Sequence, residues 1–208
     1  MTVKNKRNEM LGKTVVKALK QRNFDAYYAE DSKSAIDIAL SLIPKGDVVS
    51  WGGSMTIRDM GLVSAVKDAG YSVLDRDTAP PEDDIARKAL TCDTYIMSTN
   101  ALTENGELVN IDGNGNRVAA LIFGPKSVIV VAGVNKIVRT VEDAYSRVKY
   151  KAAPINAQRF DIKTPCKVTG VCNNCKCEDS ICANTVITRL SRPAKRVKVI
   201  IVGEELGF

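Results

Sequence analysis

Apolar residues recur along much of the chain at the spacing of a helix, three or four positions apart. Residues 9–22 bring Val15 and Leu19 onto one face, which predicts an amphipathic helix. A second helix, capped by Asp31 or Ser32, is predicted from the same spacing. The other predicted helices cover residues 56–69, 81–91, 117–123 and 140–150.

Short apolar runs separate these helices, and such runs are typical of strands buried on both faces. The predicted strands are 24–29, 48–51, 71–75, 93–98 and 127–132, with further β-rich segments at 185–190 and 197–202. Because strands and helices alternate, we predict an α/β fold with a mostly parallel sheet covered on both faces. We expect a single domain over residues 1–208, with a loop-rich stretch at 99–116 and an irregular, cysteine-rich loop at 160–183.

Composition narrows the possible functions. Apolar residues make up 45% of the chain, enough for a packed core, and histidine is absent. The absence of histidine excludes Ser-His-Asp and Cys-His nucleophiles, the HExxH zinc site and imidazole proton transfer. The net charge of +6 equals the excess of basic residues in 1–22. No aromatic stacking platform accompanies them, so we interpret this segment as a solvated helix face and do not expect a nucleic-acid partner.

No apolar run is long enough to cross a bilayer, and the charged N-terminus lacks the apolar core of a signal peptide. We therefore expect no membrane span and a cytoplasmic protein. In that compartment cysteines are more often metal ligands or redox groups than disulfides.

A glycine-rich loop follows the predicted strand at 48–51. Gly52 and Gly53 let the backbone approach a ligand closely, and the Ser54 hydroxyl with the next N–H groups can hold a phosphate or carboxylate. The alternative is an ordinary turn. The loop is neither a Walker A motif nor GxGxxG, so ATP and a standard dinucleotide site are not indicated.

A polar loop after the predicted strand at 93–98 gathers further candidates. We expect a polar site there to which five side chains contribute: Asn100, Asn110, Asp112, Asn116 and Arg117. Asx residues and glycines also suit a purely structural loop, which stays as the alternative.

The third loop, Gly133-Val134-Asn135-Lys136, directly follows the predicted strand at 127–132. We expect Asn135 to contact the ligand. Lys136 or Arg117 would pair with an anionic ligand. Without histidine, a carboxylate or lysine must transfer protons. The candidate catalytic residues are therefore Lys136 together with Asp112, Glu104 or Glu107.

Five of the six cysteines lie between residues 166 and 182. A cytosolic thiol cluster with no histidine favours a metal site over a disulfide or redox cluster. Both Zn²⁺ and a [4Fe–4S] cluster accept four thiolates, and the spacing matches no standard motif for either. Cys92 stands apart and is predicted to be a small buried residue.

Read together, the loops resemble the lactate-utilisation (LUD) domain family. The matching segments are Trp51-Gly52-Gly53-Ser54, Asn100-Ala101-Leu102-Thr103, residues 108–120 around Asp112-Gly113-Asn114-Gly115-Asn116-Arg117, Gly133-Val134-Asn135-Lys136, Pro165-Cys166 with Cys172 and Cys175, and residues 202–208. The resemblance implies a three-layer α/β fold similar to CoA transferases and ribose-5-phosphate isomerase (NagB/RpiA-like). It also implies a role around L-lactate oxidation beside iron–sulfur subunits. The family's cysteine-bearing branch implies Cys166, Cys172, Cys175 and Cys182 as metal ligands, with Cys177 as an extra thiol.

Two functions follow as hypotheses. The first is a redox component of 2-hydroxy-acid utilisation, with a [4Fe–4S] cluster beside a small-carboxylate site and iron–sulfur subunits as partners. The second is a non-redox enzyme or binding protein for a phosphate ester or CoA-like ligand, with structural zinc. We expect a homo-oligomer, and whether the chain is an enzyme by itself is left open.

Overall fold

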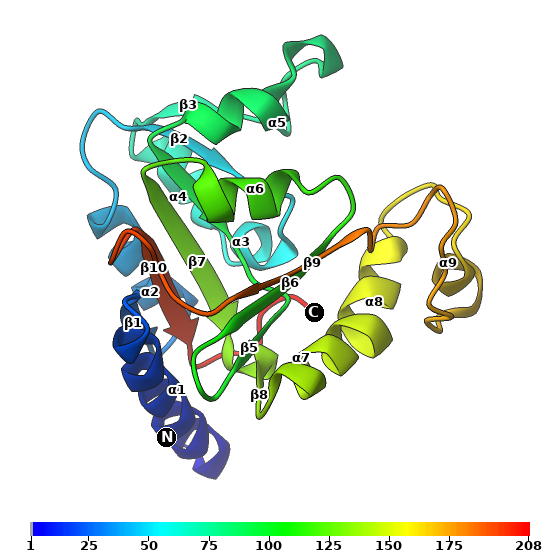
Figure 1. Ribbon diagram of the computed structural model, residues 1–208. Helices are drawn as coiled ribbons and strands as arrows, with labels where there is room; N and C mark the ends of the chain where they lie inside the picture. Colours follow the sequence, from blue (N-terminus) through cyan, green and yellow to red (C-terminus); the bar gives the residue numbers. More distant parts are fainter. Residues whose placement is uncertain (1) are drawn as a thin grey trace.

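The computed structural model describes residues 2–208 and places the chain around a six-stranded sheet (Figure 1). All its neighbouring strands are parallel, as the continuous apolar runs predicted. In spatial order the strands are β1 (Asp25–Ala29), β10 (Val197–Val202), β7 (Ser127–Gly133), β4 (Thr94–Met97), β2 (Val48–Trp51) and β3 (Ser72–Leu74). The α/β fold with a mostly parallel sheet is confirmed.

Helices cover both faces of this sheet, because alternate residues of each strand point to opposite sides. Val128 and Val130 of β7 pack with residues of α1 and α6, whereas Ile129 and Val131 pack with residues of α2, α3 and α4. The helices are α1 (Val3–Gln21), α2 (Ser32–Ser41), α3 (Met55–Asp59), α4 (Leu62–Asp68), α5 (Ile85–Lys88), α6 (Asn116–Phe123), α7 (Val141–Arg147), α8 (Ala153–Ala157) and α9 (Pro165–Thr169).

Several helix boundaries differ from the sequence prediction for local reasons. The helix predicted at 56–69 is divided by Gly61, whose φ of +85° is left-handed, into α3 and α4. The segment 81–91 holds only the short α5 between 3₁₀ turns at Pro81–Asp83 and Ala89–Thr91. A π turn at Val148–Ala152 extends α7 into α8, which has a proline near its start.

The stretch 99–116, predicted to be rich in loops, also holds two strands. It contains β5 (Ala101–Thr103) and β6 (Leu108–Asp112), which pair as an antiparallel hairpin. Gly106 turns the chain at φ +83°. The hairpin forms a second sheet with β8 (Ile137–Val138) and β9 (Asn184–Thr188). A 3₁₀ turn at Val134–Lys136 leads from β7 into β8.

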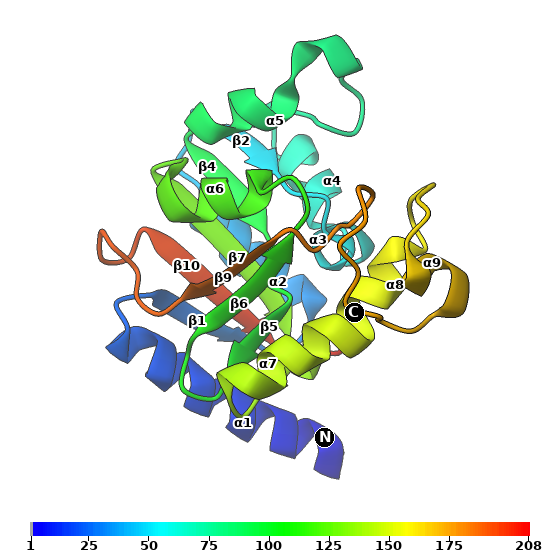
Figure 2. The same ribbon diagram turned by 45° about the vertical axis from the view of Figure 1, so that its right-hand side comes forward.

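The second sheet lies on the α6 side of the main sheet, and α7 packs across its other face (Figure 2). Val109 and Ile111 of β6 pack with Ala144 of α7 and with Val148 of the π turn that follows it. Leu108 faces the main core. The segment from α9 to β9, which holds the clustered cysteines, projects beyond α8 and away from the main sheet in both views.

Candidate functional site

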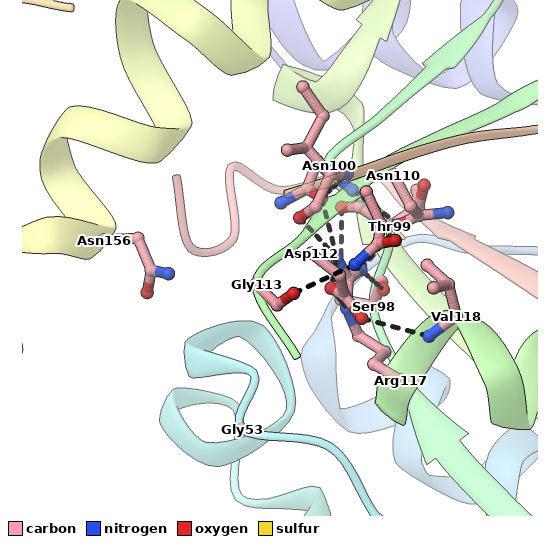
Figure 3. A network of polar contacts seen from close by, with 12 residues as sticks. Gly53, Ser98, Thr99, Asn100, Asn110, Asp112, Gly113, Arg117, Val118 and Asn156 are labelled. Atoms are coloured by element: carbon pink, nitrogen blue, oxygen red, sulfur yellow. Dashed lines mark hydrogen bonds and ion pairs between the residues drawn. The ribbon is translucent and has the colours of Figure 1, made fainter. Parts of the chain in front are cut away.

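A pocket of about 620 Å³ opens where the parallel strands end. The loops that follow β2, β3, β4 and β7 supply its inner wall, as expected for an open parallel sheet. Residues 160–162 and 178–181, which belong to the cysteine-rich loop, supply the outer wall. Figure 3 shows the inner wall, with Gly53 and Asn156 outside its central group of polar residues.

Arg117 is the centre of a dense polar network in this wall (Figure 3). Its Nε donates to Asp112 Oδ1 at 2.8 Å, and Nη1 donates to Asn110 Oδ1 at 2.5 Å and to the Ser98 carbonyl at 3.1 Å. Nη2 donates to Asp112 Oδ1, Asn100 Oδ1 and the Ile111 carbonyl. A guanidinium has five N–H donors, so every one is used within the protein. Arg117 therefore organises the wall, and no donor is left for a ligand.

Asp112 is held as firmly as Arg117. Its Oδ1 accepts from the arginine and its Oδ2 accepts from the backbone N–H of Val118 at 3.1 Å. The second bond caps the first turn of α6, whose N-cap residue Gly115 has no side chain to do so. Both carboxylate oxygens are occupied, which disfavours Asp112 as a general base.

The predicted asparagines divide into two groups. Asn100 and Asn116 line the pocket, whereas Asn110 is fully buried behind Arg117 and does not line it. Asn100 Oδ1 accepts from Ile111 N, which ties the strand ends together, and its Nδ2 donates to no residue of the described chain. Asn100 can therefore donate a hydrogen bond to a ligand.

Lys136 is the last residue of the 3₁₀ turn that follows β7. It lines the pocket although it is only 4% exposed. Its Nζ donates to Thr56 Oγ1 at 2.8 Å and to Ser98 Oγ at 3.0 Å. Among residues 2–208 no carboxylate forms an ion pair with it. Burial, reinforced by the Arg147 and Arg117 guanidinium groups, lowers the pKa of Lys136 to about 7.

Arg147 adds a second cation without a carboxylate partner beside the pocket. Its Nε donates to the Asn135 carbonyl at 3.2 Å and its Nη1 to the Asn100 carbonyl at 2.7 Å. Its Nη2 is buried and has no hydrogen-bond partner within the described chain. Arg117 and Lys136 line the inner wall with one carboxylate, that of Asp112, and Arg147 lies beside them. The outer wall carries the carboxylates of Asp161, Glu178 and Asp179, so it is the inner wall that favours an anionic group.

The glycine loop contributes shape more than hydrogen bonds. Gly53 and Ser54 line the pocket, and Ser54 is the N-cap residue of α3 without a side-chain cap bond, so its hydroxyl is available. Gly52 is buried, and a Cβ there would lie 3.2 Å from Tyr95 Oη. Glycine at this position lets β2 pass close to Tyr95.

Three candidates lie away from the pocket. Asn135 binds the C-terminal segment: its Oδ1 accepts from Leu206 N at 3.1 Å, and its Nδ2 points to the carbonyls of Leu206 and Gly207. Glu104 is exposed in the β5–β6 turn, and Glu107 beside it is paired with Arg22 of the segment after α1. The structure does not bring either glutamate to the other predicted site residues.

Sequence reasoning missed two rim cations, Arg76 and Arg159. Arg76 follows β3 and approaches Gly53, and Arg159 Nη1 donates to the Gly53 carbonyl at 2.9 Å. Burial, together with the nearby Arg58 and Arg76, lowers the pKa of Arg159. The position of Arg76 directly after a predicted strand was a usable signal, whereas nothing in the sequence places Arg159 there.

The cysteine-rich loop brings its thiols near one another. Cys166 is buried beside Thr164, and Cys182 packs against the core under α7. Burial raises the pKa of Cys182, and the thiols of Cys172, Cys166 and Cys175 are close enough to raise it further. Cys177 is exposed, and a hydrogen bond with the Cys175 thiol raises the pKa of Cys177. Cys177 therefore lies beside one of the four predicted ligands, and its assignment as the extra thiol stays a prediction.

The four thiols suit a soft metal by their chemistry. As placed, no group of three or more Cys, Asp or Glu side chains in the described residues converges on one point. None of the thiols lines the pocket, although the adjoining residues 178–181 do. Cys92 is separate and buried, as predicted, with its thiol directed at the Thr94 carbonyl.

Comparison with protein-family models gives one match, described as the LUD domain, over residues 12–202. No curated protein matches the sequence. None of the helices in the described chain is long and apolar enough to traverse a bilayer.

The fold is shared with solved structures. A crystal structure of a DUF162 family protein from Deinococcus radiodurans matches with a TM-score of 0.56 and 14% identity, over 94% of this chain and 98% of that one. eIF2B beta from Chaetomium thermophilum matches over 54% of this chain and 44% of its own, with a TM-score of 0.39 and 16% identity. The first similarity extends over nearly the whole of both chains and shows a common fold.

Proposed function

This chain belongs to the LUD domain family, and we propose that it serves L-lactate utilisation by binding a small 2-hydroxy or 2-oxo carboxylate in the pocket beside Lys136. The observation that carries the proposal is the environment of Lys136 Nζ, which is buried, bonded to two hydroxyls and without a carboxylate partner. A buried cation of this kind is costly unless an anion joins it. Attraction to a carboxylate about 4 Å away is worth roughly 4 kcal/mol at an effective dielectric constant of 20.

The residues around Lys136 have separate tasks in this proposal. Thr56 and Ser98 hold the amine toward the pocket, and the Arg117–Asp112 pair fixes the strand ends from which Ser98 and Asn100 project. The free amide nitrogen of Asn100 and the hydroxyl of Ser54 would donate to the hydroxyl or carboxylate of the ligand. Ligand binding thus uses groups that the protein leaves unsatisfied.

We further propose that Cys166, Cys172, Cys175 and Cys182 hold a [4Fe–4S] cluster that makes the protein a redox component working with iron–sulfur subunits. The proximity of Cys182 to Cys166, Cys172 and Cys175 supports this ligand set, and the exposure of Cys177 is compatible with its assignment as the extra thiol. Such a cluster would supply one-electron transfer. The chain's own contribution is to hold the thiols on a loop whose far end also lines the pocket.

Anaerobic purification with iron, zinc and sulfide analysis tests the cluster. We expect a brown protein with about four iron and four sulfide per chain. Cys175→Ser should lose this metal, whereas the matched Cys177→Ser should keep it. A colourless protein with zinc, or equal loss in both variants, would contradict the cluster or its ligand set.

Calorimetric titration with lactate and pyruvate tests the carboxylate site. Lys136→Met should weaken binding by roughly 10–100-fold, the effect of losing a charged hydrogen bond. The control Lys17→Met alters an exposed lysine of α1 and should bind like the wild type. Binding that is unchanged in Lys136→Met would remove the lysine from the site.

A second function is favoured by the size and rim of the pocket. Its volume of about 620 Å³ is typical of ligands much larger than a three-carbon acid, and Arg76 and Arg159 suit a phosphate at the rim. The alternative is a non-redox protein for a phosphate ester or CoA-like ligand, with zinc on the four cysteines. Tight binding of such a ligand, lost in an Arg76→Met/Arg159→Met variant, together with zinc and no sulfide, would favour it.

A further inference from the structure

We infer that Lys136 is a nucleophile: its amine adds to the carbonyl carbon of a 2-oxo acid in the pocket and forms a covalent imine. The inference rests on the proposed carboxylate site and specifies the form of substrate that the site takes. It assigns Lys136 a covalent role in place of a simple ionic one.

The first argument is the position of the amine. Lys136 Nζ lies at the pocket wall between the Thr56 and Ser98 hydroxyls, at 2.8 and 3.0 Å, and these two bonds leave the third direction of the nitrogen for a ligand. Gly207 of the C-terminal segment is close enough that a Cβ there would lie 3.5 Å from Nζ. The amine is thereby shielded from solvent on one side and accessible from the pocket on the other.

The second argument is the charge around it. The groups facing Nζ are the hydroxyls of Thr56 and Ser98 and the guanidinium groups of Arg117 and Arg147, and no described carboxylate pairs with it. Burial beside other cations is the arrangement that activates a lysine, because it favours the neutral amine. The pKa of about 7 leaves a large share of Lys136 unprotonated near neutral pH.

The third argument is that the neighbouring hydroxyls can complete the chemistry. The nitrogen lone pair forms a bond to the carbonyl carbon, the C=O π electrons move to oxygen, and a proton passes from nitrogen to that oxygen, giving a carbinolamine. Loss of the hydroxyl with a further proton releases water and leaves the C=N bond. Thr56 and Ser98 can each accept and donate a proton during these transfers. The sequence of steps needs no oxidant or reductant.

Reductive trapping of the full-length protein tests this step. The protein is incubated with pyruvate or 2-oxobutyrate and sodium cyanoborohydride, which reduces an imine to a stable secondary amine. We expect a mass increase of one reduced adduct per chain, mapped by peptide analysis to Lys136. Lactate has no carbonyl group to condense with an amine and should leave the mass unchanged.

Variants and pH sharpen the test. Lys136→Arg keeps a cation but cannot form the imine, so the adduct should fall to background, whereas Lys17→Arg should react like the wild type. Below pH 7 the trapping rate should rise about tenfold per pH unit and level off above it, following the neutral amine. Because peptide mapping is done on the wild type, a poorly folded variant does not obscure the result.

The outcomes separate this inference from the proposed function. If lactate and pyruvate bind in titration but no adduct forms on Lys136, the covalent role is wrong and the carboxylate site stands. If Lys136 is trapped by 2-oxobutyrate while lactate and pyruvate do not bind, the nucleophile stands and the lactate function is wrong. If neither binding nor trapping occurs, both are wrong.

Discussion

Arg117 and Lys136 both lie in the wall of one pocket, but their surroundings differ. Those of Arg117 suit a structural role, and those of Lys136 suit ligand binding or reaction. Arg117 donates every N–H to acceptors within the protein and has Asp112 as its counter-ion. Lys136 is more deeply buried, bonds two neutral hydroxyls and lacks a counter-ion among the described residues. Arg117, whose hydrogen bonds and charge are satisfied, stabilises the fold. Lys136, whose charge is not balanced by a carboxylate, favours binding an anion or reacting as a neutral amine.

The largest change in stability is expected from removing the Arg117 guanidinium. Arg117→Met leaves Asp112, Asn100 and Asn110 without their shared donor in a nearly buried site, and we expect a loss of about 3–5 kcal/mol in the free energy of unfolding. Urea denaturation measures it. Arg87→Met, which breaks the exposed pair with Asp84, should cost less than about 1 kcal/mol. Equal effects of the two substitutions would mean that the network is not a stabilising centre.

Removing the unsatisfied cation should have the opposite sign. Since the folded-state pKa of Lys136 is lowered from 10.5 to about 7, the charged form is disfavoured on folding. The loss of folding stability caused by burying the charged Lys136 is complete below about pH 7. It disappears as pH approaches 10.5, where the lysine of the unfolded chain also releases its proton. Lys136→Met should therefore raise stability by about 1–3 kcal/mol at pH 6.

The pH dependence of this gain is the decisive measurement. Thermal or urea unfolding of Lys136→Met and wild type between about pH 6 and 10 should show the difference shrinking as pH rises. Lys17→Met, at an exposed site, should show no such trend. A variant that is less stable than the wild type at every pH would show that the lysine is already compensated.

A smaller effect is expected at the hydroxyls. Ser98→Ala removes one acceptor that stabilises the charged amine, so the pKa of Lys136 should fall further and the pH at which trapping levels off should fall with it. The stability change should be about 1 kcal/mol. Ser41→Ala, at an exposed helix end, is the matched control. An upward shift in the trapping profile would contradict the assigned role of Ser98.

The smallest effect is expected at Glu104, which was a candidate catalytic group from the sequence. Because it is exposed in the β5–β6 turn, outside the pocket, Glu104→Gln should change stability by less than about 0.5 kcal/mol and leave pyruvate binding unaltered. Titration calorimetry is sufficient to check this. A tenfold loss of affinity would show that the turn reaches the ligand.

The sequence predicted the main sheet well because its strands are continuous apolar runs with few competing interpretations. It predicted β9 of the second sheet but not β5 and β6 as strands, because β6 carries Asn110 and Asp112, which look like loop residues. Their burial depends on the guanidinium of Arg117, and a sequence pattern does not reveal that pairing. Burial of this strand is compatible with Asp112 and with the oxygen of Asn110 because both accept hydrogen bonds from residues beyond the strand, whereas Asn110 Nδ2 has no partner within the described chain.

The candidate site was predicted in part for the same reason. The position of Lys136 after a strand was visible in the sequence, and its placement in the pocket agrees with that reasoning. Its burial was not visible, because it is created by Thr56, Ser98 and the segment around Gly207, which lie far apart in the chain. The distinction between Asn100 in the pocket and Asn135 on the C-terminal segment also depends on three-dimensional packing.

The start of β9 joins the two functional regions. Asn184 lies two residues after Cys182, pairs with Asp112 across the second sheet and donates to the Gly113 carbonyl at 2.9 Å. A change in how the cysteine loop closes would therefore displace the edge of the pocket, and a ligand that fixes this edge would restrain the loop. If metal loading tightens ligand affinity by some factor, thermodynamic reciprocity requires bound ligand to tighten the equilibrium affinity for the metal by the same factor.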